Sequence, residues 1–224
     1  MDENLRDAPL FKALDDETAR NLRKSMVSQK LVKGQTLFQE GQPGDRLYLV
    51  VNGKVKLSHS SGDGRESVFM VLGPGEMFGE LSLFDPGPRT STAIAVTDAQ
   101  VLGLSHTDIR PFLIEYPEVA LSLLQAVAHR LRRTSEAMSD LVFADVPGRV
   151  AKALIDLSEK FGEKRASGIQ VNHDLTQEEL AQLVGASRET VNKALADFAS
   201  RGWIRLETKS VELLDIERLT KRAK

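Results

Sequence analysis

The segment from Pro117 to Phe143 constrains the fold of this chain most, because after Pro117 it contains no glycine and no further proline. Pro117 suits the first turn of a helix, where its missing N–H would have no partner in any case. Mostly apolar residues recur along the segment at alternating intervals of three and four. The set is Leu121, Leu124, Ala128, Leu131, Ser135, Met138 and Val142. This spacing predicts a long helix with a dimeric coiled-coil seam that has one polar interruption.

A second interpretation of the same stripe is a helix that packs on a sheet of its own chain. Arg130, Arg132 and Arg133 flank the stripe and leave it narrow. A narrow stripe favours a seam between two helices over a broad core face. We therefore expect residues 117–144 to form a dimerisation helix and the protein to be a homodimer.

The chain before this helix has a different character. From Leu31 to Leu104, short apolar runs are separated by glycine-bearing turns such as GQPGD, SSGDG and GPGEM. Strands of this length with turns at this spacing are typical of an antiparallel sandwich or jelly roll. Asn52-Gly53 is a turn type that favours a tight hairpin. Residues 1–116 are expected to form this first domain.

Two charged residues stand among packing residues in the segment GELSLFDPGPRT, at positions 79–90. Glu80 precedes an apolar run, and Arg89 follows a turn made of two prolines and a glycine. A carboxylate and a guanidinium in such surroundings need partners. The residues alone leave two interpretations open, an internal ion pair between Glu80 and Arg89 or a site where both bind a ligand.

The residues DVPG at 145–148 predict a hinge between two domains. Asp145 can cap a helix and Pro147 fits a first helical turn, while the glycine adds flexibility. The next helix is expected to run from Arg149 to Phe161. Residues 149–224 are expected to form the second domain.

Residues 174–198, DLTQEELAQLVGASRETVNKALADF, predict two helices joined by a tight turn. Thr176 and Glu179 have the spacing of a capping box at the first helix, and Ser187 can cap the second. The first helix is expected to end at Gly185. Small and apolar residues on the facing sides let the helices cross closely, as a helix-turn-helix requires.

The exposed half of the second helix carries side chains that suit base reading. Arg188 can pair with O6 and N7 of guanine, and Glu189 can accept from cytosine N4; a solvated charged face is the alternative. The following segment GWIRLETKSVELLD predicts two short strands that form a wing, with Lys209 at its tip to reach a phosphate. The predicted DNA-binding residues are Thr176, Gln177, Ser187, Arg188, Glu189, Thr190, Lys193 and Lys209.

Composition excludes several classes of function. The chain of 224 residues is 41% hydrophobic and 28% charged, which suits a globular protein of two domains. It has no cysteine, which excludes disulfides, thiolate zinc sites and cysteine-ligated iron–sulfur clusters. Its four histidines lack ligand spacing, so no metal is expected. No nucleophile–base pair indicates an enzyme.

Charge and hydropathy bear on partners and location. The net charge of −2 argues against an indiscriminate nucleic-acid binder, so a DNA-binding face must come from local clustering. No apolar run is long enough to span a bilayer. The N-terminus has acidic residues where a signal peptide would carry positive charge. A cytoplasmic protein is expected.

Four segments carry a resemblance to a known family: FGELSLFDPGPRTS at 78–91, RRTSE at 132–136, FADVPGR at 143–149 and LTQEELAQLVGASRETVNKAL at 175–195. With these segments the chain resembles, from end to end, the cyclic AMP receptor proteins of the Crp/Fnr transcription-factor family, above all the actinobacterial members. The resemblance implies an α+β fold with an N-terminal cyclic-nucleotide-binding β-roll (jelly roll), a long dimerisation helix and a C-terminal winged helix-turn-helix. It also implies a bacterial regulator with cyclic AMP as allosteric effector, and double-stranded DNA and RNA polymerase as partners.

The resemblance assigns roles within the segment 79–90. Glu80 is expected to accept hydrogen bonds from the ribose 2′-hydroxyl, and Arg89 to pair with the cyclic phosphate. Further effector contacts are expected from Gly79, Leu81, Thr90, Arg130, Thr134 and Ser135. For Ser135 a register device in the seam is the alternative. Lys193 stands where the best-known members have an arginine, which puts base selectivity at that position in doubt.

The predicted function is therefore that of a cyclic AMP-responsive transcriptional regulator, a homodimer that reads a palindromic TGTGA-type operator. The alternative is a constitutive Crp-like DNA-binding regulator with a weak or vestigial nucleotide response. A regulatory subunit of a kinase or channel would share the first domain but would lack a reading helix. Ligand is expected to shift the population between two arrangements of the long helices, with the hinge passing the change to the reading helices.

Overall fold

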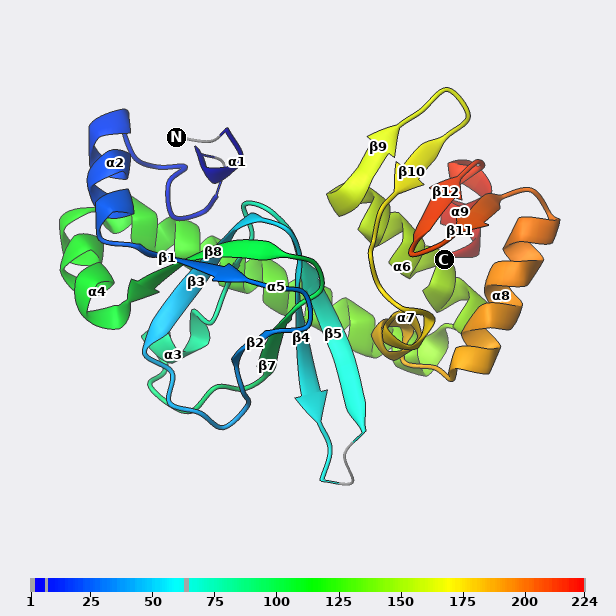
Figure 1. The fold of residues 1–224 in the computed structure, drawn as a ribbon, viewed down its shortest axis with the longest axis horizontal. Helices are drawn as coiled ribbons and strands as arrows, with labels where there is room; N and C mark the ends of the chain where they lie inside the picture. Colours follow the sequence, from blue (N-terminus) through cyan, green and yellow to red (C-terminus); the bar gives the residue numbers. More distant parts are fainter. Residues whose placement is uncertain (1–2, 7, 63–64, 224) are drawn as a thin grey trace. The chain divides into compact units, whose positions relative to one another are not determined.

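The computed structural model describes residues 3–6, 8–62 and 65–223, and Figure 1 shows their helices and strands. The chain divides into two compact units, which are described separately. The first comprises Met1–Gly64 and Met70–Arg133, and the second comprises Arg65–Phe69 and Thr134–Lys224. Helices and strands are both abundant, so the predicted α+β class is confirmed.

The described strands of the N-terminal part form two four-stranded sheets. One has the order β1-β8-β3-β6, with β1 at Val27–Leu31, β8 at Ala99–Ser105, β3 at Arg46–Asn52 and β6 at Met77–Phe78. The other has the order β2-β7-β4-β5, with β2 at Thr36–Phe38, β7 at Thr92–Ala95, β4 at Val55–Ser60 and β5 at Glu66–Leu72. The pairs β1–β8, β3–β8, β3–β6, β2–β7 and β4–β7 are antiparallel. This is the predicted sandwich of antiparallel strands.

Strand β3 is buried on both faces, which explains its continuous apolar run LYLVV. Leu47 and Leu49 point to a cluster that the N-terminal helices and α5 share, whereas Tyr48 and Val50 belong to a second cluster with residues of the other sheet. The alternation follows from the two-residue period of a strand. The N-terminal part therefore has one apolar layer between its sheets and another under its helices.

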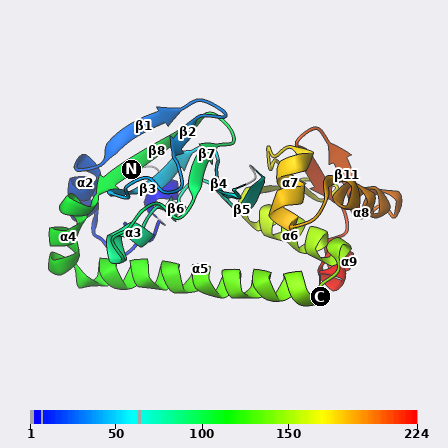
Figure 2. The ribbon, with the colours of Figure 1, turned by 90° about the horizontal axis from the view of Figure 1, so that it is seen from below.

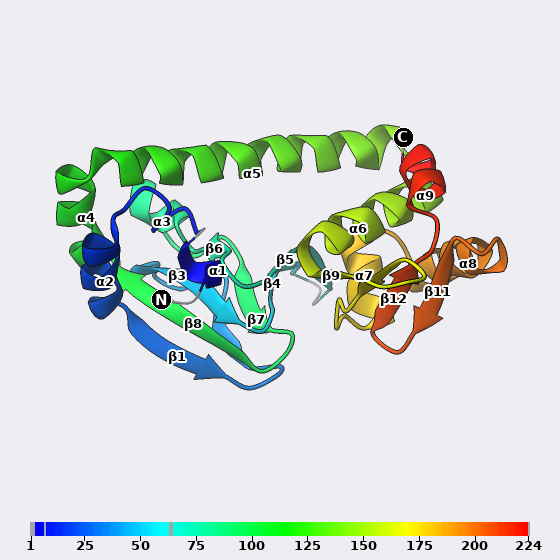
Figure 3. The same cartoon turned by 90° about the horizontal axis from the view of Figure 1, so that it is seen from above.

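Helices cover the outer face of the β1-β8-β3-β6 sheet. They are α1 (Glu3–Arg6), α2 (Asp16–Lys24), α4 (His106–Glu115) and the first turns of α5 (Pro117–Phe143). The remaining described helix of this part, α3, is short and comprises Leu81–Phe84. Asp15 caps α2 and Ser105 caps α4 through their side-chain oxygens. Figure 3 shows α5 as one uninterrupted helix, which ends at Phe143, one residue before the predicted end at 144.

The turn at Asn52-Gly53 does not join two paired strands, which corrects the predicted hairpin. The flanking strands β3 and β4 belong to different sheets. Gly53 has φ of +74°, and a Cβ at this position would lie 2.2 Å from the carbonyl oxygen of Asp98. The glycine is therefore needed because the turn packs on the chain before β8 while it leads from one sheet to the other.

The C-terminal unit combines helices with a small sheet. Its elements are α6 (Val146–Phe161), β9 (Gly162–Lys164), β10 (Ile169–Val171), α7 (Gln177–Val184), α8 (Arg188–Ser200), β11 (Ile204–Glu207), β12 (Ser210–Leu213) and α9 (Ile216–Arg222). The sheet has the order β11-β12-β10-β9, and α6 packs against α7, α8 and α9. Leu154, Ala181, Val191 and Phe198 are among the buried core residues.

Helix α6 begins at Val146, three residues before the predicted start at Arg149. Asp145 is its N-cap and accepts a hydrogen bond from Gly148 N at 2.9 Å, and Pro147 lies in the first turn. An aspartate cap and an early proline both stabilise a helix start, so the glycine at the third position does not delay it. A hinge at residues 145–148 stays a prediction.

None of the helices in the described ranges is both long and apolar enough to cross a membrane.

Candidate functional site

The segment from Gly79 to Thr90 is fixed to the loop before β3 through its backbone. Arg89 N donates to Gln42 O at 2.7 Å, and Gly41 N donates to Arg89 O at 2.8 Å. The neighbouring residues Pro43 and Pro88 face each other as an isolated antiparallel bridge. These contacts fix the position from which the Arg89 side chain departs.

The guanidinium of Arg89 is buried, with 4% of its side chain exposed. Its Nη1 donates to Gly79 O at 3.1 Å, and its Nη2 lies 3.8 Å from a carboxylate oxygen of Asp45. Its Nε is buried and has no hydrogen-bond partner among the described residues. Burial lowers the pKa of Arg89 from its ordinary value, while Tyr48 and Asp45 act in the opposite direction. The group is a cation with incomplete hydrogen bonding, which suits it to an anion.

The carboxylate of Glu80 is equally buried, since the residue is 1% exposed. Its Oε1 accepts from Nη1 of Arg130 at 2.6 Å, and Arg130 also donates to Met77 O at 2.5 Å. Its Oε2 is buried with no hydrogen-bond partner among the described residues. Glu80 is also the N-cap of α3 without capping it through its side chain. One oxygen is thus left to accept from a donor such as a hydroxyl.

An internal ion pair between Glu80 and Arg89 was one interpretation of the sequence. Within the described residues, the ion-pair partner of Glu80 is Arg130, and that of Arg89 is Asp45. Each therefore keeps a buried polar atom to offer, an acceptor on Glu80 and a donor on Arg89. Together they can bind a molecule that carries both a hydroxyl and an anionic group.

The other predicted residues of this segment lie around the pair. Gly79 has φ of +75°, and a Cβ on it would lie 2.7 Å from Nη1 of Arg89, so only glycine admits the guanidinium here. Leu81 and Thr90 are exposed at the edge of the segment.

The predicted seam of α5 is exposed along its whole length. Leu121, Leu124, Leu131, Met138 and Val142 are 52–73% exposed, and Ala128 and Ser135 are exposed with them. The residues of α5 that enter the core of the N-terminal part are instead Val119 and Leu123. The stripe therefore does not pack on a sheet of its own chain, and that interpretation is wrong. Thr134 is also exposed, one turn after Arg130 on the same helix.

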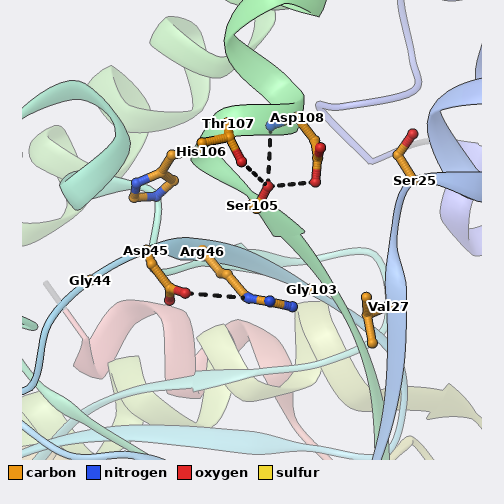
Figure 4. A pocket seen from close by; sticks show the side chains of 10 residues that line it. All are labelled: Ser25, Val27, Gly44, Asp45, Arg46, Gly103, Ser105, His106, Thr107 and Asp108. Atoms are coloured by element: carbon orange, nitrogen blue, oxygen red, sulfur yellow. Dashed lines mark hydrogen bonds and ion pairs between the residues drawn. The ribbon is translucent and has the colours of Figure 1, made fainter.

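A hollow of about 500 Å³ lies in the N-terminal unit (Figure 4). Its lining residues are Ser25, Val27, Gly44, Asp45, Arg46, Gly103, Ser105, His106, Thr107 and Asp108. Figure 4 shows that several of its polar groups satisfy one another, with Ser105 bonded to Thr107 and Asp108, and Asp45 paired with Arg46. Neither Glu80 nor Arg89 lines the hollow, but Asp45, the ion-pair partner of Arg89, does, so the hollow adjoins the predicted effector site.

The predicted DNA-binding residues lie together on α7, α8 and the turn between them (Figure 2), apart from Lys209. All eight are exposed. The capping box of Thr176 and Glu179, the left-handed Gly185 and the Ser187 cap are present as predicted. The elbow is therefore a helix-turn-helix with a polar outer face.

Contacts on this face order the side chains that were assigned to base reading. The side-chain oxygen of Gln177 accepts from Arg188 at 3.3 Å and from Asn192 at 3.2 Å. Lys193 pairs with Glu189 at 2.6 Å. Asn192 was not predicted, although its position four residues after Arg188 on a helix places it on the same face.

Strands β11 and β12 form the predicted wing, with residues from Ile204 to Leu213 in register. Lys209 lies in the two-residue turn with φ of +59°, and its carbonyl accepts from Asp174 N at 2.9 Å. The turn is thereby anchored to the segment that precedes α7. The predicted place of Lys209 at the wing tip is confirmed.

Both domains of the chain are similar to domains of known proteins. Residues 28–116 match the family model of the cyclic nucleotide-binding domain, and residues 148–222 match that of the Crp-like helix-turn-helix domain. The chain is 51% identical to the CRP-like cAMP-activated global transcriptional regulator of Mycobacterium tuberculosis, with 100% of both chains covered. It is 36% identical to the Cyclic AMP receptor protein of Thermus thermophilus, covering 93% of this chain and 94% of that protein.

Solved structures agree with this comparison. The catabolite activator protein of Thermus thermophilus is 35% identical, with a TM-score of 0.56 over 96% of this chain and 98% of that one. The c-di-GMP responsive global regulator CLP of Xanthomonas campestris is 26% identical, with a TM-score of 0.76 over 89% of this chain and 99% of that one. These relatives are transcriptional regulators rather than enzymes. With matching domains at both ends and a relative identical at half its positions, the chain belongs to the Crp/Fnr family of transcription factors.

Proposed function

We propose that this protein is a transcriptional regulator that binds cyclic AMP as effector and operator DNA as a homodimer. The observation that carries the proposal is the pair of buried, unpartnered polar atoms, Oε2 of Glu80 and Nε of Arg89, within the cyclic nucleotide-binding domain. The names of the relatives from Mycobacterium tuberculosis and Thermus thermophilus both contain cyclic AMP, which supports that nucleotide as the effector.

In the proposed complex the guanidinium of Arg89 pairs with the cyclic phosphate, because a planar fork matches two phosphate oxygens. Glu80 accepts from the ribose 2′-hydroxyl with the oxygen that Arg130 does not use. Gly79, Leu81 and Thr90 add backbone or hydroxyl contacts. Arg130 connects α5 to the effector site, because it donates a hydrogen bond to Glu80.

Dimerisation would cover the exposed stripe of α5. Five large apolar side chains at coiled-coil spacing are 52–73% exposed on one chain, and a second copy of α5 is the complementary surface for them. Ser135 interrupts the stripe with a hydroxyl and Thr134 precedes it in the chain, and we assign both hydroxyls to the adenine. Residues 117–144 then act as the dimerisation helix between domains 1–116 and 149–224.

The reading helix α8 is proposed to enter the major groove with Arg188 and Glu189 on base edges. Gln177 orients Arg188 by accepting a hydrogen bond from it. Two such helices related by a two-fold axis read inverted half-sites about one helical turn apart. The TGTGA-type palindrome and RNA polymerase as a further partner rest on family resemblance.

Ligand is proposed to act by population shift. Arg130 joins the effector site to α5, and α5 ends where the carbonyl of Ala144 accepts from Arg149 of α6. A ligand that binds one arrangement of α5 more tightly increases the population of that arrangement by its differential affinity, typically about 1–3 kcal/mol.

Calorimetric titration with cyclic AMP tests the effector site. Arg89→Leu and Glu80→Ala should each lower affinity by about tenfold or more, because a charge-assisted contact contributes roughly 1.5–3 kcal/mol. Arg20→Leu, an exposed arginine on α2, is the matched control and should bind as the parent does. Unchanged titration curves for both site variants would refute the assignment.

Fluorescence anisotropy on a TGTGA-type palindrome, with and without cyclic AMP, then tests the response. The proposal requires tighter operator binding in the presence of cyclic AMP. Tight operator binding that cyclic AMP leaves unchanged would identify the constitutive alternative. Parallel titrations with cyclic GMP and cyclic di-GMP would reveal a different effector.

The same assay separates base reading from phosphate contact. Arg188→Ala should cost about 1–3 kcal/mol on the specific site and relax the preference at one guanine. Lys209→Ala should weaken specific and scrambled DNA alike and lower the salt slope by about one. Equal losses of Arg188→Ala on both kinds of DNA would contradict direct reading.

A further inference from the structure

Three aromatic rings form a wall beneath the guanidinium of Arg89. Phe38, Tyr48 and Phe78 lie with ring centroids 5.5–6.0 Å apart. They come from β2, β3 and β6, so the wall spans both sheets of the N-terminal part. All three are buried in the cluster between the sheets. Core packing holds their ring positions, because side chains in close-packed interiors have few alternatives.

Arg89 rests on this wall. The central carbon of its guanidinium lies 4.3 Å from the centroid of the Phe38 ring and 5.6 Å from that of Tyr48. Both distances fall within the range of cation–π attraction, which strengthens when the cation is desolvated. Burial raises the pKa of Tyr48, and the charge of Arg89 opposes that rise, which is consistent with their proximity.

The aromatic contact offsets the cost of burying this cation without using its donors. Nη1 of the guanidinium donates to Gly79 O, the hydroxyl of Tyr48 also interacts with the guanidinium, Asp45 lies 3.8 Å away, and Nε has no partner among the described residues. A guanidinium whose N–H groups all donate to protein acceptors would have no N–H group left to donate to a ligand. A guanidinium that is stabilised by stacking on aromatic rings can keep N–H groups available for a ligand.

We propose that Phe38 and Tyr48 are positioning residues for anion binding, which hold the Arg89 guanidinium in place by its face and leave its N–H groups to a phosphate diester. This inference rests on the proposed function, since it concerns the same nucleotide site. Phe38 makes the closer contact and has the larger effect.

The competing explanation is that Phe38 merely fills the core. Phe38→Leu keeps an apolar side chain but removes the π face, and Tyr48→Phe keeps the ring but removes the hydroxyl. The inference predicts that Phe38→Leu weakens cyclic AMP binding about fivefold to thirtyfold, and that Tyr48→Phe, which loses only the contact of the hydroxyl with the guanidinium, weakens it less. Phe38→Tyr, which restores a ring, should recover most of the affinity.

A double-mutant cycle with Arg89→Gln separates the two explanations, because a neutral amide has no charge for the ring to attract. Cyclic AMP is titrated calorimetrically into the full chain carrying Phe38→Leu, Arg89→Gln or both, with thermal melting to verify folding. If Phe38 acts through Arg89, Phe38→Leu costs less than about twofold once Arg89→Gln is present. Phe38→Met serves in the same cycle if Phe38→Leu does not fold.

The outcomes distinguish this inference from the function on which it rests. A parent protein that binds no cyclic AMP overturns both. A parent that binds cyclic AMP, with equal losses from Phe38→Leu in the Arg89 and Arg89→Gln proteins, overturns the aromatic positioning alone. A loss confined to the protein that retains Arg89, with recovery in Phe38→Tyr, supports it.

Discussion

Replacement of the half-exposed Arg149 of α6 by methionine should destabilise the C-terminal unit. The guanidinium donates to three carbonyl oxygens, at 2.8 Å to Ala144, at 3.0 Å to Val184 and at 3.1 Å to Gly185. Ala144 follows the last turn of α5, and the other two carbonyls end α7. One side chain thus satisfies carbonyls at two helix ends, where intrahelical partners are missing.

The magnitude follows from the three bonds. A net value of about 1 kcal/mol each is appropriate, since the site is only half-buried and water can replace part of the loss. Methionine keeps much of the apolar stem, so the expected destabilisation is about 2–3 kcal/mol. Arg149→Lys should recover less than half of it, because an ammonium lacks the planar fork that reaches several carbonyls at once.

Urea unfolding followed by tryptophan fluorescence reports on the C-terminal unit, which contains the destabilised site. Trp203 is the only tryptophan of the chain, and its ring stacks on Phe198 with centroids 5.4 Å apart. With a slope of about 2 kcal/mol/M, the unfolding midpoint should fall by roughly 1–1.5 M. Arg165→Met, the same substitution at an exposed loop position, is the control. A midpoint equal to that of the control, or full stability in Arg149→Lys, would refute the reasoning.

Three further predictions concern the N-terminal part and α5. Gly79→Ala should weaken cyclic AMP binding in calorimetry by about tenfold or more, since its Cβ would collide with Arg89; unaltered affinity would contradict the packing. Burial lowers the pKa of His106, so the folded state favours the neutral ring and loses stability as pH falls below about 6.5. The melting temperature of the parent should therefore fall more between pH 7.5 and 5.5 than that of His106→Asn, and parallel pH profiles would disprove this. Thr134→Leu with Ser135→Ile should tighten the dimer by about 1.5–3 kcal/mol for each fully packed side chain, as measured by sedimentation. The same variant should bind cyclic AMP more weakly and bind the operator without ligand in anisotropy. A variant that stays dimeric but needs cyclic AMP for operator binding as much as the parent does would exclude this role of the seam.

The parts of the fold that the sequence predicted correctly depend on local signals. The bounds of α5, the capping box at Thr176, the left-handed Gly185 and the wing turn are each determined within a few residues of chain. The predicted start of α6 at Arg149 is three residues late, because the flexibility of Gly148 matters less than Asp145 and Pro147, which both favour a helix start.

The parts that sequence could not predict depend on long-range packing. The residues 79–90 indicated that Glu80 and Arg89 need partners, but not that Arg130 would hold Glu80 or that Phe38 would lie under Arg89. Asn52-Gly53 fitted a hairpin turn locally, whereas strand pairing places β3 and β4 in different sheets. Local spacing carries no information on which strands pair or which rings meet across two sheets.

The 50 residues that separate Glu80 from Arg130 determine when the effector site can form during folding. Contacts of such long sequence separation cost loop-closure entropy, and the site is complete only when the sheets and α5 have met. A nucleotide that binds only the finished site then stabilises the native state without assisting its formation. Cyclic AMP should therefore slow unfolding and leave the folding rate unchanged, so that effector concentration would set the lifetime of the folded chain rather than the speed at which new molecules mature.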